Sequence, residues 1–244
     1  MSGAVGGMML ANYRPAVVSG GDPYWSNVTL LMHMDGSNGG TTFVDSKGGK
    51  TVTATSVTTS TTQTKFGNAS AVWSGSTSSQ QLTLASSTDW DISTGNWTIE
   101  CWVYWTNAVG SDSSICCRRT TGTNGWAMNV YGFRAKVNGV WSDAHISNSS
   151  GITANTWHHM AWVRNGSTLR YYVDGSIPSG TTYTSQANAV STIDNLSSEV
   201  FRIGVNSNAY ENSFRGYIDD FRFTKGVARY TSNFTPPTLV FPDN

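Results

Sequence analysis

The chain has 244 residues, with 15 basic and 15 acidic side chains and a formal net charge of zero. Charged residues make up 12% of it, about half of the usual share, and no cluster of Lys and Arg occurs, which argues against a nucleic-acid partner. Aromatic residues make up another 12%, which excludes a disordered chain, and no apolar run approaches the roughly 20 residues of a membrane span.

The first 25 residues differ from the rest of the chain. They are rich in Gly, Met and Ala and show neither a helical nor a strand period. We therefore predict an extended N-terminal arm, residues 1–25, followed by one folded domain, residues 26–244. The start lacks a basic n-region, so no signal peptide is expected. Apolar side chains of the arm are predicted to anchor it to a partner protein, because flexible Met adapts to irregular surfaces. The predicted anchoring residues are Met8, Met9, Leu10 and Tyr13.

Short β-type runs fill the rest of the chain, separated by clusters of Gly, Asn, Asp and Ser. The clearest strand is NWTIECWVYWT, residues 96–106. The best hairpin is TWHHMAWVRNGSTLRYYVDG, residues 156–175, in which Asn165-Gly166 predicts a type I′ turn. No helical period persists over three turns, so we predict an all-β, antiparallel two-sheet sandwich. A first strand is expected to end at Asp35, and further strands are expected near residues 70–74, 80–85, 126–131, 133–138, 200–205 and 214–224.

Six segments occur in an order that resembles a known family. They are LLMHMDGSNGGTTFVDSKG, QTKFGNASAVWSG, WTIECWVYW, NTWHHMAWVRNGSTLRYYVDG, FRIG and GYIDDFRFTKGVARYTSNFTPPT. Together they are similar to the laminin-G-like domain of the concanavalin A-like lectin/glucanase superfamily, over about residues 28–238. The resemblance implies a jelly-roll sandwich with a concave and a convex sheet. The ending GVARYTSNFTPP is similar to the version common in bacteriophage virion proteins.

Catalytic residues are not indicated by the sequence. The glucanases of this superfamily place two Glu and an Asp on one face of a strand, whereas Glu100 has no acid two or four residues away. His158 and His159 are neighbours in a strand and face opposite ways, so they cannot share a metal ion. We expect His159 to be a hydrogen-bonded core residue in line with Trp157, and we predict that the protein is not an enzyme.

A calcium ion is implied by the resemblance, held between the first and last core strands. Calcium takes six to eight oxygen ligands. The candidates are Asp35, Asp45 and Asp219. The alternative is that Asp219, within YIDDFRF, accepts backbone N–H groups from a loop and needs no ion. Its neighbour Asp220 is expected to pair with Arg222 or with solvent.

Aromatic side chains offer a third kind of site, because sugar rings stack on them. Trp102 and Tyr104 share one strand face, and three further aromatic residues lie near predicted loops. The predicted glycan-binding residues are Trp102, Tyr104, Trp126, Tyr131 and Trp141. The alternative for each of them is packing in the core.

These expectations combine into one functional hypothesis. We expect a phage virion structural protein, made in the host cytoplasm, whose arm binds capsid or tail proteins and whose domain adheres weakly to surface polysaccharide. One alternative is a secreted carbohydrate-binding module or glycan-active enzyme. Another is a decoration protein without a ligand. Homo-oligomer formation is left open.

Overall fold

The computed structural model describes residues 20–75, 79–93, 95–107, 114–120, 125–130, 132–137, 140–146, 151–183, 196, 198–207 and 214–244. In these ranges the regular structure consists of strands and two short 3-10 helices. The elements are η1 (Trp25–Asn27), β1 (Val28–Met32), β2 (Val52–Thr55), β3 (Thr58–Ser60), β4 (Ser70–Trp73), β5 (Gln81–Leu84), η2 (Thr88–Trp90), β6 (Trp97–Trp105), β7 (Ser114–Arg119), β8 (Gly125–Asn129), β9 (Gly132–Val137), β10 (Val140–Ile146), β11 (Trp157–Asn165), β12 (Thr168–Val173), β13 (Thr181–Tyr183), β14 (Phe201–Ile203) and β15 (Gly216–Lys225).

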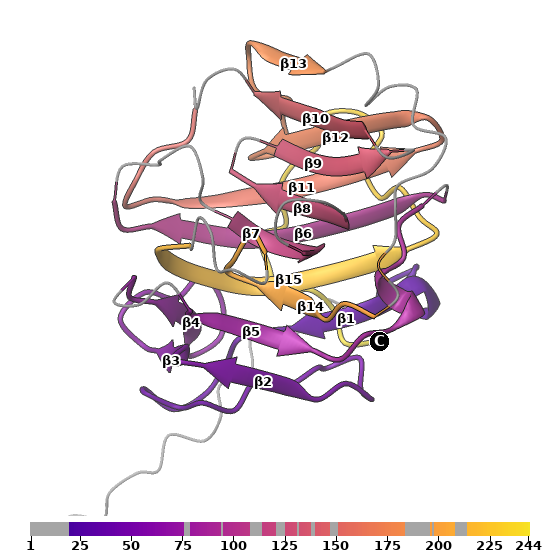
Figure 1. Cartoon of the computed structure of the whole chain (residues 1–244). Coiled ribbons are helices and arrows are strands. Elements are labelled where there is room, and N and C mark those ends of the chain that lie inside the picture. The colour runs from indigo at the N-terminus through magenta and orange to yellow at the C-terminus, as the bar shows by residue number, and fades with distance from the viewer. Residues whose placement is uncertain are drawn as a thin grey trace, which may run out of the picture.

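The strands form two antiparallel sheets packed face to face (Figure 1). One sheet has seven strands in the order β12-β11-β6-β15-β4-β3, with β1 also paired to β15. The other has eight strands in the order β13-β10-β9-β8-β7-β14-β5-β2. Sequential strands are split between the sheets, as in a jelly roll, and the predicted all-β sandwich is confirmed.

A large aromatic core fills the space between the sheets. Trp90 stacks on Phe201 with their ring centroids 4.8 Å apart, and the indole N–H of Trp162 donates to the Gly132 carbonyl oxygen at 2.8 Å. A buried indole needs such a partner to avoid a desolvation penalty. The three cysteines are buried and free, as expected of reduced core residues. The fully buried tryptophans are Trp73, Trp90, Trp97, Trp105, Trp126 and Trp162.

The β11–β12 hairpin is confirmed, but its turn lies one residue later than predicted. Asn165 pairs with Thr168, so the loop residues are Gly166 and Ser167. Gly166 has a φ of 60°, and Ser167 is not among the described residues with a positive φ. A positive φ at the first loop position alone is typical of a type II′ turn, so the type I′ prediction was wrong.

A β-bulge interrupts β15 at its two aspartates. Asp219 lies opposite Trp102 and Arg222 opposite Glu100, so two residues of β15 face one residue of β6. The bulged residue Asp220 has a φ of 47°. Strict alternation along YIDDFRF, residues 217–223, would place Phe221 on the face of Tyr217. Because of the bulge, Phe221 instead enters the core on the side of Ile218.

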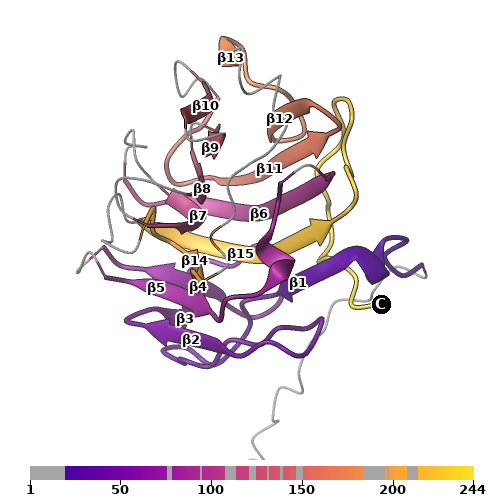
Figure 2. The same cartoon turned by 45° about the vertical axis from the view of Figure 1, so that its right-hand side comes forward.

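The C-terminal segment, residues 226–244, covers part of the outer face of the seven-stranded sheet (Figure 2). Tyr230 and Phe234 stack on each other at 3.6 Å and pack with Ala161, Val163 and Tyr172. Residues 20–27 also lie against this sheet, where Asp22 is buried. The predicted anchoring residues Met8, Met9, Leu10 and Tyr13 lie outside the described residues.

Candidate functional site

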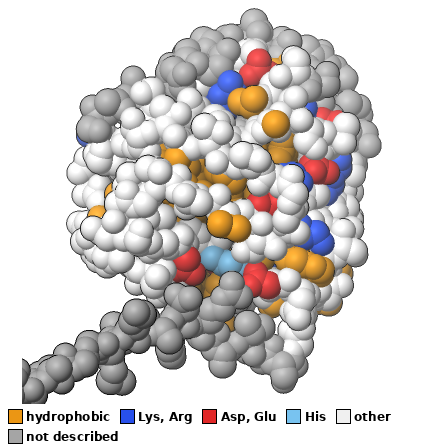
Figure 3. All heavy atoms as spheres, turned by 90° about the horizontal axis from the view of Figure 1, so that it is seen from below, with side chains coloured by type: hydrophobic (Ala, Val, Ile, Leu, Met, Phe, Trp, Pro, Cys, Tyr) orange, Lys and Arg blue, Asp and Glu red, His pale blue; other side chains and the backbone are white. Residues whose placement is uncertain are grey.

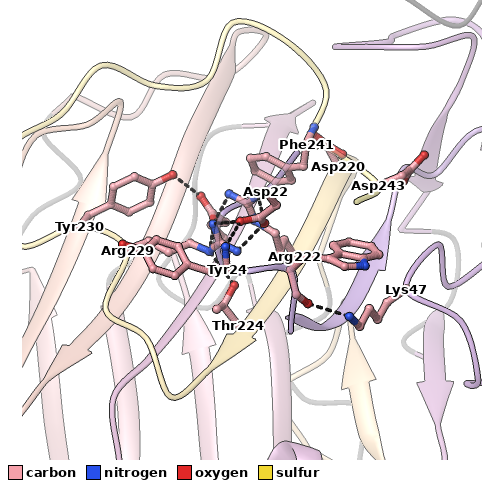
Figure 4. Close-up of polar contacts among 12 residues, drawn as sticks. Asp22, Tyr24, Lys47, Asp220, Arg222, Thr224, Arg229, Tyr230, Phe241 and Asp243 are labelled. Atoms are coloured by element: carbon pink, nitrogen blue, oxygen red, sulfur yellow. Dashed lines mark hydrogen bonds and ion pairs between the residues drawn. The ribbon is translucent and has the colours of Figure 1, made fainter. Parts of the chain in front are cut away.

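A buried ion network lies beneath the C-terminal segment (Figure 4). Arg222 donates two hydrogen bonds to Glu100 Oε1, at 2.9 and 2.8 Å, and a third to Asp22 Oδ2 at 3.0 Å. Arg229 binds both oxygens of Asp22, at 3.0 and 2.6 Å. The Tyr230 hydroxyl donates to Glu100 Oε2 at 2.7 Å. Two carboxylates and two guanidinium groups from four separate segments thus neutralise one another.

The network gives Glu100 a structural role. Burial alone would raise the pKa of its carboxyl, but the charge of Arg222, together with His159 and Arg229, lowers that pKa well below its usual range. Glu100 is fully buried, and the lowered pKa keeps it anionic at neutral pH. A carboxylate that holds no proton and meets no solvent cannot serve as a general acid. His159 is also fully buried, with its Nε2 3.3 Å from Glu100 Oε2.

The two aspartates of the β15 bulge have different partners. Asp219 Oδ2 accepts the backbone N–H groups of Lys65 and Phe66, at 2.8 and 3.1 Å. Asp220 instead contacts His33 Nδ1 at 2.7 Å and accepts the Phe241 backbone N–H at 2.7 Å. The expected pairing of Asp220 with Arg222 or solvent was wrong: Asp220 is fully buried against His33 and Phe241, while the guanidinium of Arg222 bonds Glu100 and Asp22.

Asp35 meets the same loop as Asp219. Its Oδ1 accepts the N–H groups of Asn68 and Ala69, at 2.7 and 3.3 Å. Gly67 allows this approach, because a Cβ there would lie 2.2 Å from the same oxygen. Asp45 is held elsewhere, by the N–H groups of Leu31 and Lys47.

A calcium site at Asp35 and Asp219 stays a prediction. Among the described residues no group of three or more His, Cys, Asp or Glu side chains could hold a metal ion. Asp219 Oδ1 is buried and has no hydrogen-bond partner there, which fits a bound cation. It fits a proton as well, because burial, with the charges of Asp220 and Asp35, raises the pKa of Asp219 well above its usual value.

Chelation separates these two states of Asp219. If calcium bridges Asp35 and Asp219, a chelator should lower the melting temperature and added calcium should restore it, because a ligand stabilises the state that binds it. Asp219→Asn should abolish this response, whereas Asp91→Asn should keep it. A melting temperature indifferent to chelator would argue against calcium and favour the alternative, in which the backbone N–H groups of Lys65 and Phe66 hold Asp219 without an ion.

His33 joins the end of β1 to the C-terminal segment. Its two ring nitrogens each lie 2.7 Å from a carboxylate oxygen, one of Asp220 and one of Asp243. Figure 3 shows this lower face of the sandwich, where a histidine and acidic side chains reach the surface; the side chain of Asp220 itself is fully buried. Burial lowers the pKa of His33, but the two aspartates outweigh that effect and raise the pKa to about 9.

The His33 contact predicts a pH-dependent stability. The folded-state pKa of His33 lies above the ordinary value of 6.5, so its stabilisation is complete below about pH 6.5 and is lost as the pH rises through 9. We expect His33→Gln to unfold more easily than the wild type, by roughly 1–3 kcal/mol at pH 6.5, with the difference shrinking toward pH 10. Urea unfolding of both proteins across this range measures it. A difference that stays constant with pH would refute the linkage.

Two of the five predicted glycan-binding residues, Trp102 and Trp126, are buried. Trp126 is a fully buried core residue, so its prediction as a binding residue is corrected. Trp102 is 5% exposed, beneath the Lys65 ammonium group, which lies 3.7 Å from its ring centroid, and against the edge of Phe66. Tyr131 and the side chain of Trp141 lie outside what the structure describes. Tyr104, the remaining one of the five predicted residues, is half-buried.

Tyr104 belongs to an aromatic row, which we define as Trp157, Tyr104 and Tyr217. The three residues lie opposite one another on the adjacent strands β11, β6 and β15. The centroid of Tyr104 is 5.6 Å from that of Trp157 and 5.8 Å from that of Tyr217, and all three side chains are half-buried. Trp157 was expected in the core; it lies instead on the outer face.

Polar and charged groups border the aromatic row. The loop that carries Lys65 and Phe66 lies beside the aromatic row. It is held there by the contacts with Asp219 and Trp102 described above. Asp174 accepts the His159 N–H at 2.9 Å, beside the strand that carries Trp157. Asp174 also lines a pocket of about 360 Å³, whose other lining residues are Gly151, Val173, Ser176, Ile177, Pro178 and Ser179. Sequence reasoning did not find Lys65 or Asp174, because their proximity depends on how distant segments of the chain pack together.

Thr153, His158 and Asp174 have the order of a nucleophile, a base and an acid. His158 Nδ1 lies 2.6 Å from Asp174 Oδ2, and its Nε2 lies 3.2 Å from the Thr153 hydroxyl. The same Nε2 accepts the Thr153 backbone N–H at 3.1 Å. That bond occupies the lone pair a general base would use, so the arrangement acts as a structural link between two loops.

Solved structures share this fold at low sequence identity. Domain 4 of AbnA, an extracellular arabinanase from Geobacillus stearothermophilus solved with arabinotriose, matches 83% of this chain and 94% of its own length, with 16% identity and a TM-score of 0.58. The binding domain of Paraclostridial Mosquitocidal Protein 1 matches 85% of this chain at 15% identity and a TM-score of 0.58, and this chain spans 50% of that domain. Trypanosoma rangeli sialidase, solved with sialic acid, matches 82% of this chain at 10% identity and a TM-score of 0.52, over 31% of its length.

Sequence comparisons agree with the fold. No curated protein sequence matches the chain significantly. No helix within the described ranges is long and apolar enough to cross a bilayer. The family model of the concanavalin A-like lectin/glucanases superfamily named Laminin_G_3 matches residues 74–228, which is more than half of the sequence. The chain therefore belongs to the laminin-G-like family of this superfamily.

Proposed function

We propose that the domain is a non-catalytic carbohydrate-binding module and that the aromatic row is its binding platform. The observation that carries the proposal is the row itself. Three half-buried rings on adjacent strands lie side by side on the outer face of the sheet, within 5.8 Å of their neighbours. Sugar rings have apolar C–H faces that pack on such surfaces, and polar groups at the border orient their hydroxyls.

Two relatives support binding over catalysis. One similar structure is an arabinanase domain solved with arabinotriose, and another is the binding domain of a toxin. The sialidase among the relatives keeps a glycan-active enzyme as the alternative. The evidence against that alternative is that Glu100 forms ion pairs with Arg222 and Arg229 beneath the C-terminal segment.

The wider setting is also a proposal. We propose that the module is displayed on a bacteriophage particle, as a virion protein made in the host cytoplasm and attached through residues 1–19, since residues 20–25 of the predicted arm pack on the domain. The support is the ending GVARYTSNFTPP, residues 226–237, and the apolar composition of the arm. Mass spectrometry of purified particles tests this part, whereas sugar binding separates an adhesin from a decoration protein without a ligand.

Mutations in the aromatic row test the binding function. We expect Trp157→Ala and Tyr217→Ala each to lower the affinity for a bound oligosaccharide about five- to thirtyfold, because each removes one stacking ring, worth about 1–2 kcal/mol. A glycan array finds the ligand, and calorimetry measures the affinity. Tyr24→Ala is the matched control, because this exposed ring lies near Arg229, outside the row. Wild-type affinity in both row variants would reject the platform.

A further inference from the structure

We infer that the ligand of the aromatic row is a neutral sugar, and that Lys65 and Asp174 orient it by binding its hydroxyl groups from two sides. This inference rests on the proposed function and specifies its ligand class. It makes Lys65 the donor and Asp174 the acceptor of the site.

Lys65 offers unused hydrogen-bond donors at the border of the row. Its ammonium group lies 3.7 Å from the centroid of Trp102 and 5.6 Å from that of Phe66. Trp102 precedes Tyr104 by two residues on the same face of β6, so the ammonium lies about 7 Å along the strand from the row. No hydrogen bond or ion pair of this ammonium group to another described residue is found. A half-buried ammonium satisfied only by aromatic rings can still donate to a ligand.

Asp174 presents the complementary acceptor. Burial raises the pKa of its carboxyl, but the hydrogen bonds from His158 and from the His159 N–H outweigh this and lower the pKa, so the group is anionic at neutral pH. Its side chain is 45% exposed, and it lines the 360 Å³ pocket, which has the size of a small-molecule site. Each carboxylate oxygen retains a free lone-pair direction beyond the bond it already accepts.

The charges of the two groups favour a neutral ligand. The Asp174 carboxylate acts on Lys65 electrostatically, yet the two do not form an ion pair within 4 Å. A hydroxyl can donate to one group and accept from the other, and vicinal sugar hydroxyls supply this combination. A ligand carboxylate would be attracted by Lys65 but repelled by Asp174. Because the charges of these two groups cancel, the site has no net positive charge that would favour an acidic ligand.

Direct titration tests the inference. The probes are arabinotriose, cellotriose and galactotriose as neutral sugars and trigalacturonic acid as the acidic one. We expect a neutral trisaccharide to bind at least tenfold more tightly than trigalacturonic acid, with an affinity that changes less than twofold between low salt and about 0.5 M salt. Lys65→Met, which keeps the aliphatic stem above Trp102, should weaken binding about tenfold or more without changing the melting temperature. Lys47→Met is the control, because Lys47 bonds the Trp25 carbonyl in another part of the surface.

The outcomes separate this inference from the proposed function. Preference for trigalacturonic acid, or unchanged neutral-sugar binding in Lys65→Met, overturns the inference while the row remains the platform if Trp157→Ala loses binding. Wild-type sugar affinity in Trp157→Ala overturns the proposed function. Absence of binding to all four probes and to a full glycan array overturns both.

Discussion

Replacing Arg222 with Met should lower the free energy of unfolding by about 3–5 kcal/mol, because removal of one partner leaves buried charge uncompensated. Arg222 carries three of the hydrogen bonds that hold Glu100 and Asp22. Met preserves the packing of the side-chain stem, so the loss reports the guanidinium group. Arg229 remains bound to Asp22, but its nearest approach to Glu100 is 3.7 Å. Urea unfolding monitored by tryptophan fluorescence measures the change.

Lys50→Met is the matched control for Arg222→Met. The Lys50 ammonium lies 2.8 Å from Asp89 Oδ2, but both side chains are partly exposed, at 19% and 38%. Pairs of this kind contribute about 0–1 kcal/mol. If the two variants unfold at the same urea concentration, the network beneath the C-terminal segment does not hold the sandwich together.

Trp162→Ala should cost about 3–5 kcal/mol, because a fully buried indole leaves a cavity and its hydrogen bond to Gly132 is lost. Trp162 also stacks on Tyr171 with their centroids 5.6 Å apart. Trp157→Ala, on the same strand, should cost less than about 2 kcal/mol, since this ring is half-buried on the outer face. Thermal and urea unfolding of both variants compares them. A larger loss for Trp157→Ala would mean that the core lies on the face of β11 that carries Trp157, which would contradict this account.

The sequence predicts the strands where one face alternates clearly with the other. Residues 96–106 became β6, and residues 156–175 became the β11–β12 hairpin. β7 was missed, because SICCRR is buried at every position and shows no alternation. Buried Arg118 and Arg119 in that strand depend on partners from elsewhere, such as Asp91 and Asn206. Local pattern cannot anticipate such partners.

The bulge in β15 shows a second limit of sequence reasoning. Strict alternation assigned Phe221 to the face of Tyr217, whereas the extra residue at Asp220 reverses the phase and frees Tyr217 for the aromatic row. The bulge lies where the other edge of β15 changes its partner from β4 to β1. A change of partner is a property of the whole sheet, and no local residue pattern encodes it.

The candidate site was predictable only in part. Tyr104 was predicted as a glycan-binding residue on one strand face with Trp102, but its alignment with Trp157 and Tyr217 depends on the register of three strands that are distant in sequence. Lys65 lies in a loop whose position is fixed by Asp219. Membership of a lectin-like fold does not identify a ligand, so the binding function depends on these residues and not on the fold.

A crystal structure of the domain with its best-binding oligosaccharide tests the central claim most directly. Our account predicts a sugar ring stacked on at least one of Trp157, Tyr104 and Tyr217. A sugar bound elsewhere, such as the pocket of about 250 Å³ lined by Arg222 and residues 237–242, with the aromatic row free of ligand, would contradict it.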